Sequence, residues 1–341
     1  MPIQLHIPIK KGLDVSRDYY VDNVRGLVTI SIIFIHTVFW SGYGSVPQYL
    51  RNASLFIDVP IFFLLTGMTA WKTEKFNAAK QIYKLIIYFT IFTSLANIIT
   101  GNFKIEYVVS TILLKNAIVP SLPVVDGSYW FVPVYCACII LFSILKDLSY
   151  LLKWAFLLAS ALYYLVGYFG EEHGNLSFMG VDLDRVLFLT SCILIGFMFY
   201  KYKNCKFLLV GAIASLVSLS IIIYFNHNAI DLQKYKFPVG LPYVLASLFS
   251  IMIVLYGFNF KRKTMLSFIG ENSIFFYMSQ GIGASIIYYI IPLINFHPAY
   301  KLALAFCSNL IISLVIGYLM IKFTEISKAI FRKYQFNTFK W

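Results

Sequence analysis

Two basic side chains in the first long apolar run have types and a spacing suited to catalysis. Arg25 and His36 are eleven positions apart in this run. At about 100° per residue, that step returns to within roughly 20° of the same helix face, about 16 Å further along the axis. An imidazole titrates near neutral pH and can act as a general base, and a guanidinium can bind phosphate. We interpret the pair as one functional stripe; the alternative is a basic helix flank and a histidine that hydrogen-bonds a neighbouring helix.

A carboxylate in the second apolar run could assist His36. Asp58 precedes Val59 and Pro60, about one turn inside the outer end of that run. Counting inward from the outer boundary of both runs puts Asp58 near the level of His36, where it could hold the imidazole in the tautomer that a base requires. Asp58 could equally cap a helix that begins at Pro60. Both interpretations stay open.

A loop rich in lysine follows the second run. Its basic residues could receive the phosphates of a nucleotide-like donor, although the positive-inside rule explains them without a ligand. They are Lys72, Lys75, Lys80 and Lys84. No glycine-rich phosphate loop, no Ser-His-Asp order and no metal-ligand spacing occurs, so nucleotide hydrolysis and metal catalysis lack support. We expect no metal and no permanently bound cofactor.

The composition assigns these residues to a membrane protein. Of the 341 residues, 60% are hydrophobic and only 13% are charged, whereas soluble domains average about 25% charged residues. A soluble single-core enzyme is therefore excluded. The formal net charge of +13 comes from basic residues in short loops, which form no continuous stripe, so we expect no nucleic-acid partner. The five cysteines show no disulfide or zinc-site spacing.

Ten apolar runs are each long enough to cross about 30 Å of hydrocarbon as a helix. Helices or closed barrels alone satisfy the backbone in lipid, and the runs lack the period-two alternation of barrel strands. We predict an all-α polytopic bundle in which residues 1–341 form one transmembrane domain. This domain includes an N-terminal tail at 1–23 and a basic C-terminal tail at 323–341. The predicted spans are 24–42, 53–71, 82–100, 129–145, 151–169, 186–200, 207–225, 239–258, 273–294 and 301–322.

The distribution of lysine and arginine predicts that both termini are cytoplasmic. In that orientation only seven of the 28 basic residues fall outside, namely Arg51, Lys104, Lys115, Arg185, Lys234, Lys236 and Lys301. The longest outer segment, 101–128, contains an amphipathic stretch from Ile105 to Val119. This stretch could lie on the membrane surface or fold back over the spans.

Taken together, these features resemble a known family, the bacterial acyltransferase family three of membrane O-acyltransferases. The resemblance covers nearly the whole chain, and its most specific element is the spacing of Arg25 and His36. Its further motifs are Phe62-Phe63-Leu-Leu-Thr66-Gly67 in the second span, Tyr129-Trp130-Phe131 at the start of the fourth and Ile269-Gly270-Glu-Asn272-Ser273-Ile-Phe-Phe-Tyr277 at the start of the ninth.

The resemblance implies transfer of an acyl group, usually acetyl from cytoplasmic acetyl-CoA, to hydroxyls of a cell-surface glycan. It also implies a bacterial plasma membrane, with the bilayer, acyl-CoA and the glycan as partners; no feature indicates an oligomeric state. His36 then matches the catalytic histidine and Arg25 its essential partner, and Asp58 is the third catalytic candidate. Candidate donor-binding residues are Arg25, Lys72, Lys80 and Lys84, and candidate acceptor-binding residues are Trp130, Tyr129, Thr66 and Tyr277.

Two positions depart from the family pattern. Thr66 stands where Ser usually precedes Gly67 and keeps the hydroxyl, whereas Gln280 stands where the ninth-span motif often ends in His.

Two other classes of protein also need many spans. A transporter or flippase of lipid-linked sugars would show internal repeats or paired broken spans, and neither is found. A glycan polymerase would carry its catalytic residues in a long outer loop, and the outer loops here are short and poor in arginine.

Overall fold

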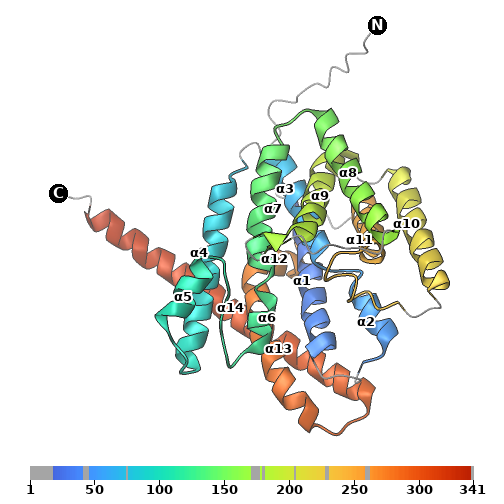
Figure 1. Cartoon of the computed structure of the whole chain (residues 1–341). Helices are drawn as coiled ribbons and strands as arrows, with labels where there is room; N and C mark the ends of the chain where they lie inside the picture. Colours follow the sequence, from blue (N-terminus) through green and yellow to red (C-terminus); the bar gives the residue numbers. More distant parts are fainter. Residues whose placement is uncertain are drawn as a thin grey trace.

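Helices make up most of the described part of the chain (Figure 1). The structure is a computed structural model and describes residues 18–40, 46–73, 76–169, 177–178, 181–202, 205–226, 230–257 and 262–338. Within these ranges the strands are β1 (Ser177–Phe178) and β2 (Val181–Asp182), a short antiparallel pair. Most of the predicted tail at 1–23, and Lys75, lie outside the described residues.

The described chain contains nine helical segments that are long and apolar enough to cross a membrane, which confirms the predicted polytopic all-α class. A shorter apolar helix, α11 (Leu241–Tyr256), occupies the eighth predicted span. Five of the nine are α1 (Tyr19–Trp40), α4 (Ala78–Ile99), α8 (Tyr150–Phe169), α10 (Lys206–Phe225) and α14 (Pro298–Thr338). Two end in a 3₁₀ turn: α9 (Leu183–Phe199) with η1 (Tyr200–Tyr202), and α13 (Ser273–Ile290) with η2 (Ile291–Leu293).

The remaining two spans are interrupted near the ends that are predicted to lie outside. The second span consists of α2 (Gln48–Ser54) and α3 (Val59–Lys72), and the fourth of α6 (Pro123–Ser128) and α7 (Phe131–Leu145). Residues 55–58 separate α2 from α3, so Asp58 stands at the break and not within a helix. Such breaks let backbone and side chains meet inside the bundle where an unbroken helix would not.

The amphipathic stretch from Ile105 to Val119 has two parts that differ in their contacts. Its first part is α5 (Ile105–Ile112), which lies against α4 (Figure 1) and exposes Ile105, Val109 and Ile112 on one face. This apolar face suits the membrane interface. Beyond α5 the chain turns at Leu114, whose φ is 57°. It then folds back so that Val119 is fully buried.

The last helix is longer than a membrane is thick. Helix α14 has 41 residues, about 60 Å at the usual rise, against a hydrocarbon core of about 30 Å. It continues without a break from the last span into the predicted tail at 323–341, and Figure 1 shows its C-terminal part running away from the other helices.

Glycines set the closest helix contacts. A Cβ on Gly67 of α3 would lie 1.9 Å from the carbonyl oxygen of Ile193 in α9, and Gly196 meets α3 in the same way. Gly26 of α1 and Gly270 of α12 (Met265–Glu271) form a second reciprocal contact. Small residues allow backbones to approach this closely in membranes. Gly67 and Gly270, which belong to two of the family motifs, therefore have a packing role.

Gly67→Ala should destabilise the protein, because the added methyl group overlaps the backbone of α9. We expect a loss of about 1–3 kcal/mol, the usual cost of overpacking, measured by thermal unfolding of protein purified in detergent. Gly211→Ala in α10 is the matched control, since its Cβ would lie 3.7 Å from Met252, an ordinary contact. Equal unfolding temperatures for the two variants would contradict the close α3–α9 contact.

Candidate functional site

His36 lies in α1 with one ring nitrogen buried and unpaired. Its Nδ1 has no hydrogen-bond partner within the described residues, although the residue as a whole is partly exposed. Buried polar atoms are nearly always hydrogen-bonded, so an unpaired one needs an explanation. The hydrogen bond to a neighbouring helix that the alternative interpretation requires is not made by this part of the chain. An unpaired nitrogen is what a base needs before its substrate arrives.

Asp58 is buried beside this histidine and carries an ion pair. Its Oδ2 accepts a hydrogen bond from the Tyr243 hydroxyl at 2.7 Å and lies 2.6 Å from Nζ of Lys236. Asp58 and Lys236 both act electrostatically on His36, although no direct hydrogen bond joins Asp58 to His36 in the described structure. Asp58 occupies the N-cap position of α3, but its side chain caps no backbone N–H. The carboxylate therefore serves the ion pair instead of the helix end.

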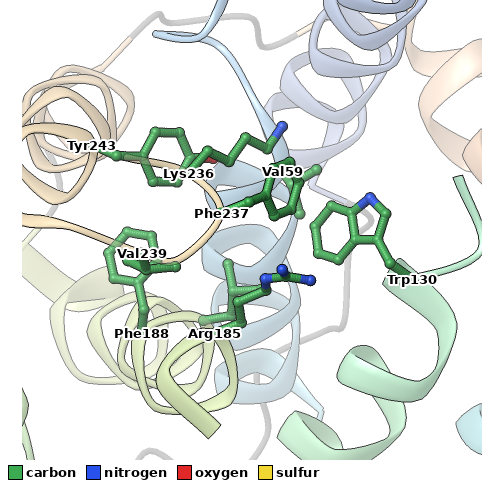
Figure 2. Close-up of a pocket in the computed structure, with 9 residues that line it drawn as sticks. Val59, Trp130, Arg185, Phe188, Lys236, Phe237, Val239 and Tyr243 are labelled. Carbon is green, nitrogen blue, oxygen red and sulfur yellow. The ribbon is translucent and has the colours of Figure 1, made fainter. Parts of the chain in front are cut away.

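Aromatic rings surround Lys236 on its other sides. Figure 2 shows the pocket, in which the Arg185 guanidinium faces Trp130. The Lys236 ammonium lies 5.9 Å from the Trp130 ring centroid, and Arg185 lies 5.4 Å from the same ring. Arg185 also pairs with Asp182 at 2.6 Å. The cavity they line measures about 10 Å³, roughly the space of one water molecule. Trp130 is thus the predicted acceptor-binding residue that the structure brings to this pocket.

Arg25 and Lys72 form a second polar cluster, at the other end of α1. The Arg25 guanidinium donates to the Thr69 hydroxyl at 3.1 Å and lies 3.4 Å from the Asp22 carboxylate. Lys72, one turn further along α3 than Thr69, pairs with Asp18 at 3.1 Å. Because α1 is unbroken, Arg25 and His36 keep the separation of about 16 Å that their spacing predicts. The structure brings Arg25 and Lys72 together.

The other two predicted donor-binding residues lie on α4. Lys80 and Lys84 are four positions apart and exposed, so they share one face of this helix. Their side chains make no ion pair with the residues that the structure describes. They remain separate from the Arg25 cluster, which does not involve α4.

The sequence matches a known family. A family model described as an acyltransferase domain matches residues 18–320. The chain belongs to acyltransferase family three. Comparisons with curated proteins and with solved structures found no match. The protein is thus a multi-pass membrane acyltransferase, and both clusters lie inside the matched region.

Three predicted acceptor-binding residues of the acyltransferase have hydroxyls that are already bonded to backbone carbonyls. Tyr129 donates to Thr111 at 2.8 Å and Tyr277 to Ser128 at 3.2 Å. Thr66 donates at 3.0 Å to the carbonyl four residues earlier in its own helix. Tyr277 is nevertheless close enough to Asp58 to interact with it electrostatically. Tyr129 is buried and packs against Phe89 of α4 at 5.8 Å between ring centroids, so its contacts in the structure are those of a core residue.

Sequence reasoning missed Lys236, Arg185 and Tyr243 as parts of the candidate site. The two basic residues did carry a signal, since both belong to the few that are predicted to lie on the outer side, against the positive-inside trend. Tyr243 carried none, because it is one of 25 tyrosines in the chain.

Tyr243→Phe should destabilise the acyltransferase, because it removes a hydrogen bond to the buried Asp58 carboxylate. Hydrogen bonds to charged groups contribute about 1.5–3 kcal/mol, so we expect a loss of that size in thermal unfolding. Tyr224→Phe is the matched control, since Tyr224 is 72% exposed. An equal effect of the two substitutions would mean that the Tyr243–Asp58 hydrogen bond does not contribute to the fold.

Proposed function

We propose that this acyltransferase moves an acetyl group from cytoplasmic acetyl-CoA to a hydroxyl of a cell-surface polysaccharide or its lipid-linked precursor, at the bacterial plasma membrane. The observation that carries the proposal is His36, whose buried Nδ1 is unpaired in the described structure while an ion pair lies beside it. Such a histidine has a free ring nitrogen at which a general base could accept a proton. The family supports acyl transfer; the acetyl group, the CoA donor and the glycan acceptor are our proposal.

The inner cluster supports a CoA donor. Arg25 and Lys72 place two cations at one end of the bundle, where the phosphates of a cytoplasmic acyl-CoA would meet them. A guanidinium suits phosphate because its N–H groups match two oxygens at once. The pantetheine arm would then run along α1 and carry the thioester toward His36. Lys80 and Lys84 on α4 would contact the nucleotide at the periphery of this phosphate site.

The proposed reaction needs one base and one leaving group. His36 takes the proton of the sugar hydroxyl while the sugar oxygen attacks the carbonyl carbon of the thioester. The carbon–sulfur bond breaks, and the CoA thiolate leaves and takes up the proton from the imidazolium. The products are the acetyl ester and CoA thiol, and His36 returns to its neutral form. Asp58 offsets the positive charge that His36 carries in between, as carboxylates do beside catalytic histidines.

His36→Ala should abolish acetylation of the surface glycan. Loss of a general base costs about 10²–10⁴-fold in rate, so the base-labile O-acetyl methyl signals in the proton NMR spectrum of the glycan should disappear. Cells with the intact gene and cells lacking it set the two limits, and immunoblots of membranes confirm equal protein. His297→Ala is the control, because His297 is exposed. A full acetyl signal with His36→Ala would refute the proposal.

Arg25→Ala should weaken the use of acetyl-CoA more than it slows turnover. Losing a charge-assisted contact with phosphate should raise KM about tenfold, corresponding to about 1.4 kcal/mol, and Arg25→Lys should recover part of this because the charge remains. The measurement is acetyl transfer in inside-out membrane vesicles at varied acetyl-CoA concentration. Lys263→Ala serves as the control, since Lys263 is exposed in a predicted inner loop. A KM for Arg25→Ala equal to that of the control would remove Arg25 from the donor site.

A further inference from the structure

One outer segment, residues 230–240, packs several of its side chains into the bundle. Loops normally run over the surface with polar side chains outward. Here Ile230, Leu232, Lys236 and Val239 are all buried, and Lys236 is only 7% exposed. The segment therefore forms part of the interior at the outer end, and it delivers a cation there.

Two polar side chains fix the ends of this segment. Asn52 of α2 donates to the carbonyl of Ile230 at 2.7 Å and accepts the N–H of Leu232 at 3.0 Å. Asp184 of α9 accepts the N–H of Val239 at 2.9 Å. Anchors on both sides of Lys236 leave its backbone little freedom. The lysine is thus held in place from two helices that are far apart in the sequence.

The Lys236–Asp58 pair is a poor source of stability. Removing two charges from water costs several kcal/mol for each ion, so well-packed hydrophobic residues often serve a fold equally well. Cation–π contacts with Phe237 at 5.4 Å and with Tyr243 at 6.0 Å offset part of that cost. Since the pair contributes little to stability, its position beside His36 indicates a role in the reaction.

The contacts of Asp58 are one-sided. Lys236 and Tyr243 both meet Oδ2, and in the part of the chain that the structure describes Oδ1 has no hydrogen-bond partner. Nδ1 of the nearby His36 is unpaired as well. Holding a carboxylate by one oxygen fixes its plane and leaves the second oxygen for another group.

We propose that Lys236 is a positioning residue for the acyl transfer. Its ammonium holds the Asp58 carboxylate in one orientation through Oδ2, so that Oδ1 can serve His36 or the acceptor hydroxyl during proton transfer. The inference rests on the proposed function. It assigns a role to a lysine that acts on the reaction only through Asp58.

Lys236→Met tests the role by its effect on turnover. We expect kcat to fall about tenfold or more, the size of couplings between contacting residues, with KM for acetyl-CoA unchanged because the donor phosphates lie at the other end of α1. Lys236→Arg should recover much of the loss, since it keeps the charge. Lys234→Met is the matched control, two positions away and exposed, and should leave acetyl transfer as in the wild type.

The double variant Asp58→Asn/Lys236→Met separates positioning from a structural role. If Lys236 acts through Asp58, the double variant loses no more activity than the worse single variant, while its thermal stability recovers because no buried charge is left uncompensated. Should Lys236→Met not accumulate in membranes, the double variant and Lys236→Arg decide the question by the same criteria.

Three results would overturn the inference. In the first, the fold losses of activity of the two single variants multiply in the double variant. In the second, the double variant recovers activity as well as stability. In the third, Lys236→Met is as active as Lys234→Met. Failure of the wild type itself to transfer acetyl from acetyl-CoA would instead overturn the proposed function on which the inference rests.

Discussion

A polar group inside hydrocarbon must find its partner within the protein, because lipid offers none. The backbone forms its hydrogen bonds within the helices, and many buried side chains hydrogen-bond to one another or to the backbone. Asn309 of α14, which is fully buried, donates to the Thr37 hydroxyl of α1 at 3.0 Å and accepts from Ser313 at 3.2 Å. Asp184 and Asp58 are engaged in the same way by groups of the outer segment 230–240. Nδ1 of His36 lacks a partner in the described structure, as do Oδ1 of Asn97 and Oε1 of Gln280. What distinguishes His36 is that an imidazole can take up a proton and that the ion pair of Asp58 and Lys236 lies beside it.

Helix α1 connects the two polar clusters. It carries Arg25 near one end and His36 about three turns further on, so the distance between the proposed phosphate site and the proposed base is fixed by the helical rise. The glycine contact between α1 and α12 holds this helix against its neighbour with no side chain in between. A rigid helix that held both ends of the proposed acyl-CoA donor would lower the cost of orienting the thioester. The fold thus supplies the geometry, and the side chains supply the chemistry.

Much of the fold and part of the site could be predicted from the sequence. Apolar runs gave the spans because length and hydrophobicity decide crossing in a bilayer, and an eleven-residue step put Arg25 and His36 on one face. Lys236 could not be placed in the same way, since its position depends on how Asn52 and Asp184 anchor a segment remote from both in sequence. The steric role of Gly67 also depends on which helix lies opposite. Periodicity describes one helix at a time, whereas these contacts join two.

The sharing of one oxygen by Lys236 and Tyr243 joins three parts of the fold at a single atom. Asp58 starts α3, Tyr243 belongs to α11, and Lys236 belongs to the outer segment 230–240. Changing any one of the three alters the charge or hydrogen bonding felt by the other two, so the effects of single substitutions on stability and on acyl transfer cannot be independent. Activity alone therefore cannot separate a residue that holds the bundle together from one that prepares His36. A single substitution of Asp58 or Lys236 leaves the charge of the other residue unpaired in the interior, and this lone charge is itself the largest disturbance. Removing both charges together takes away the carboxylate and keeps the interior neutral.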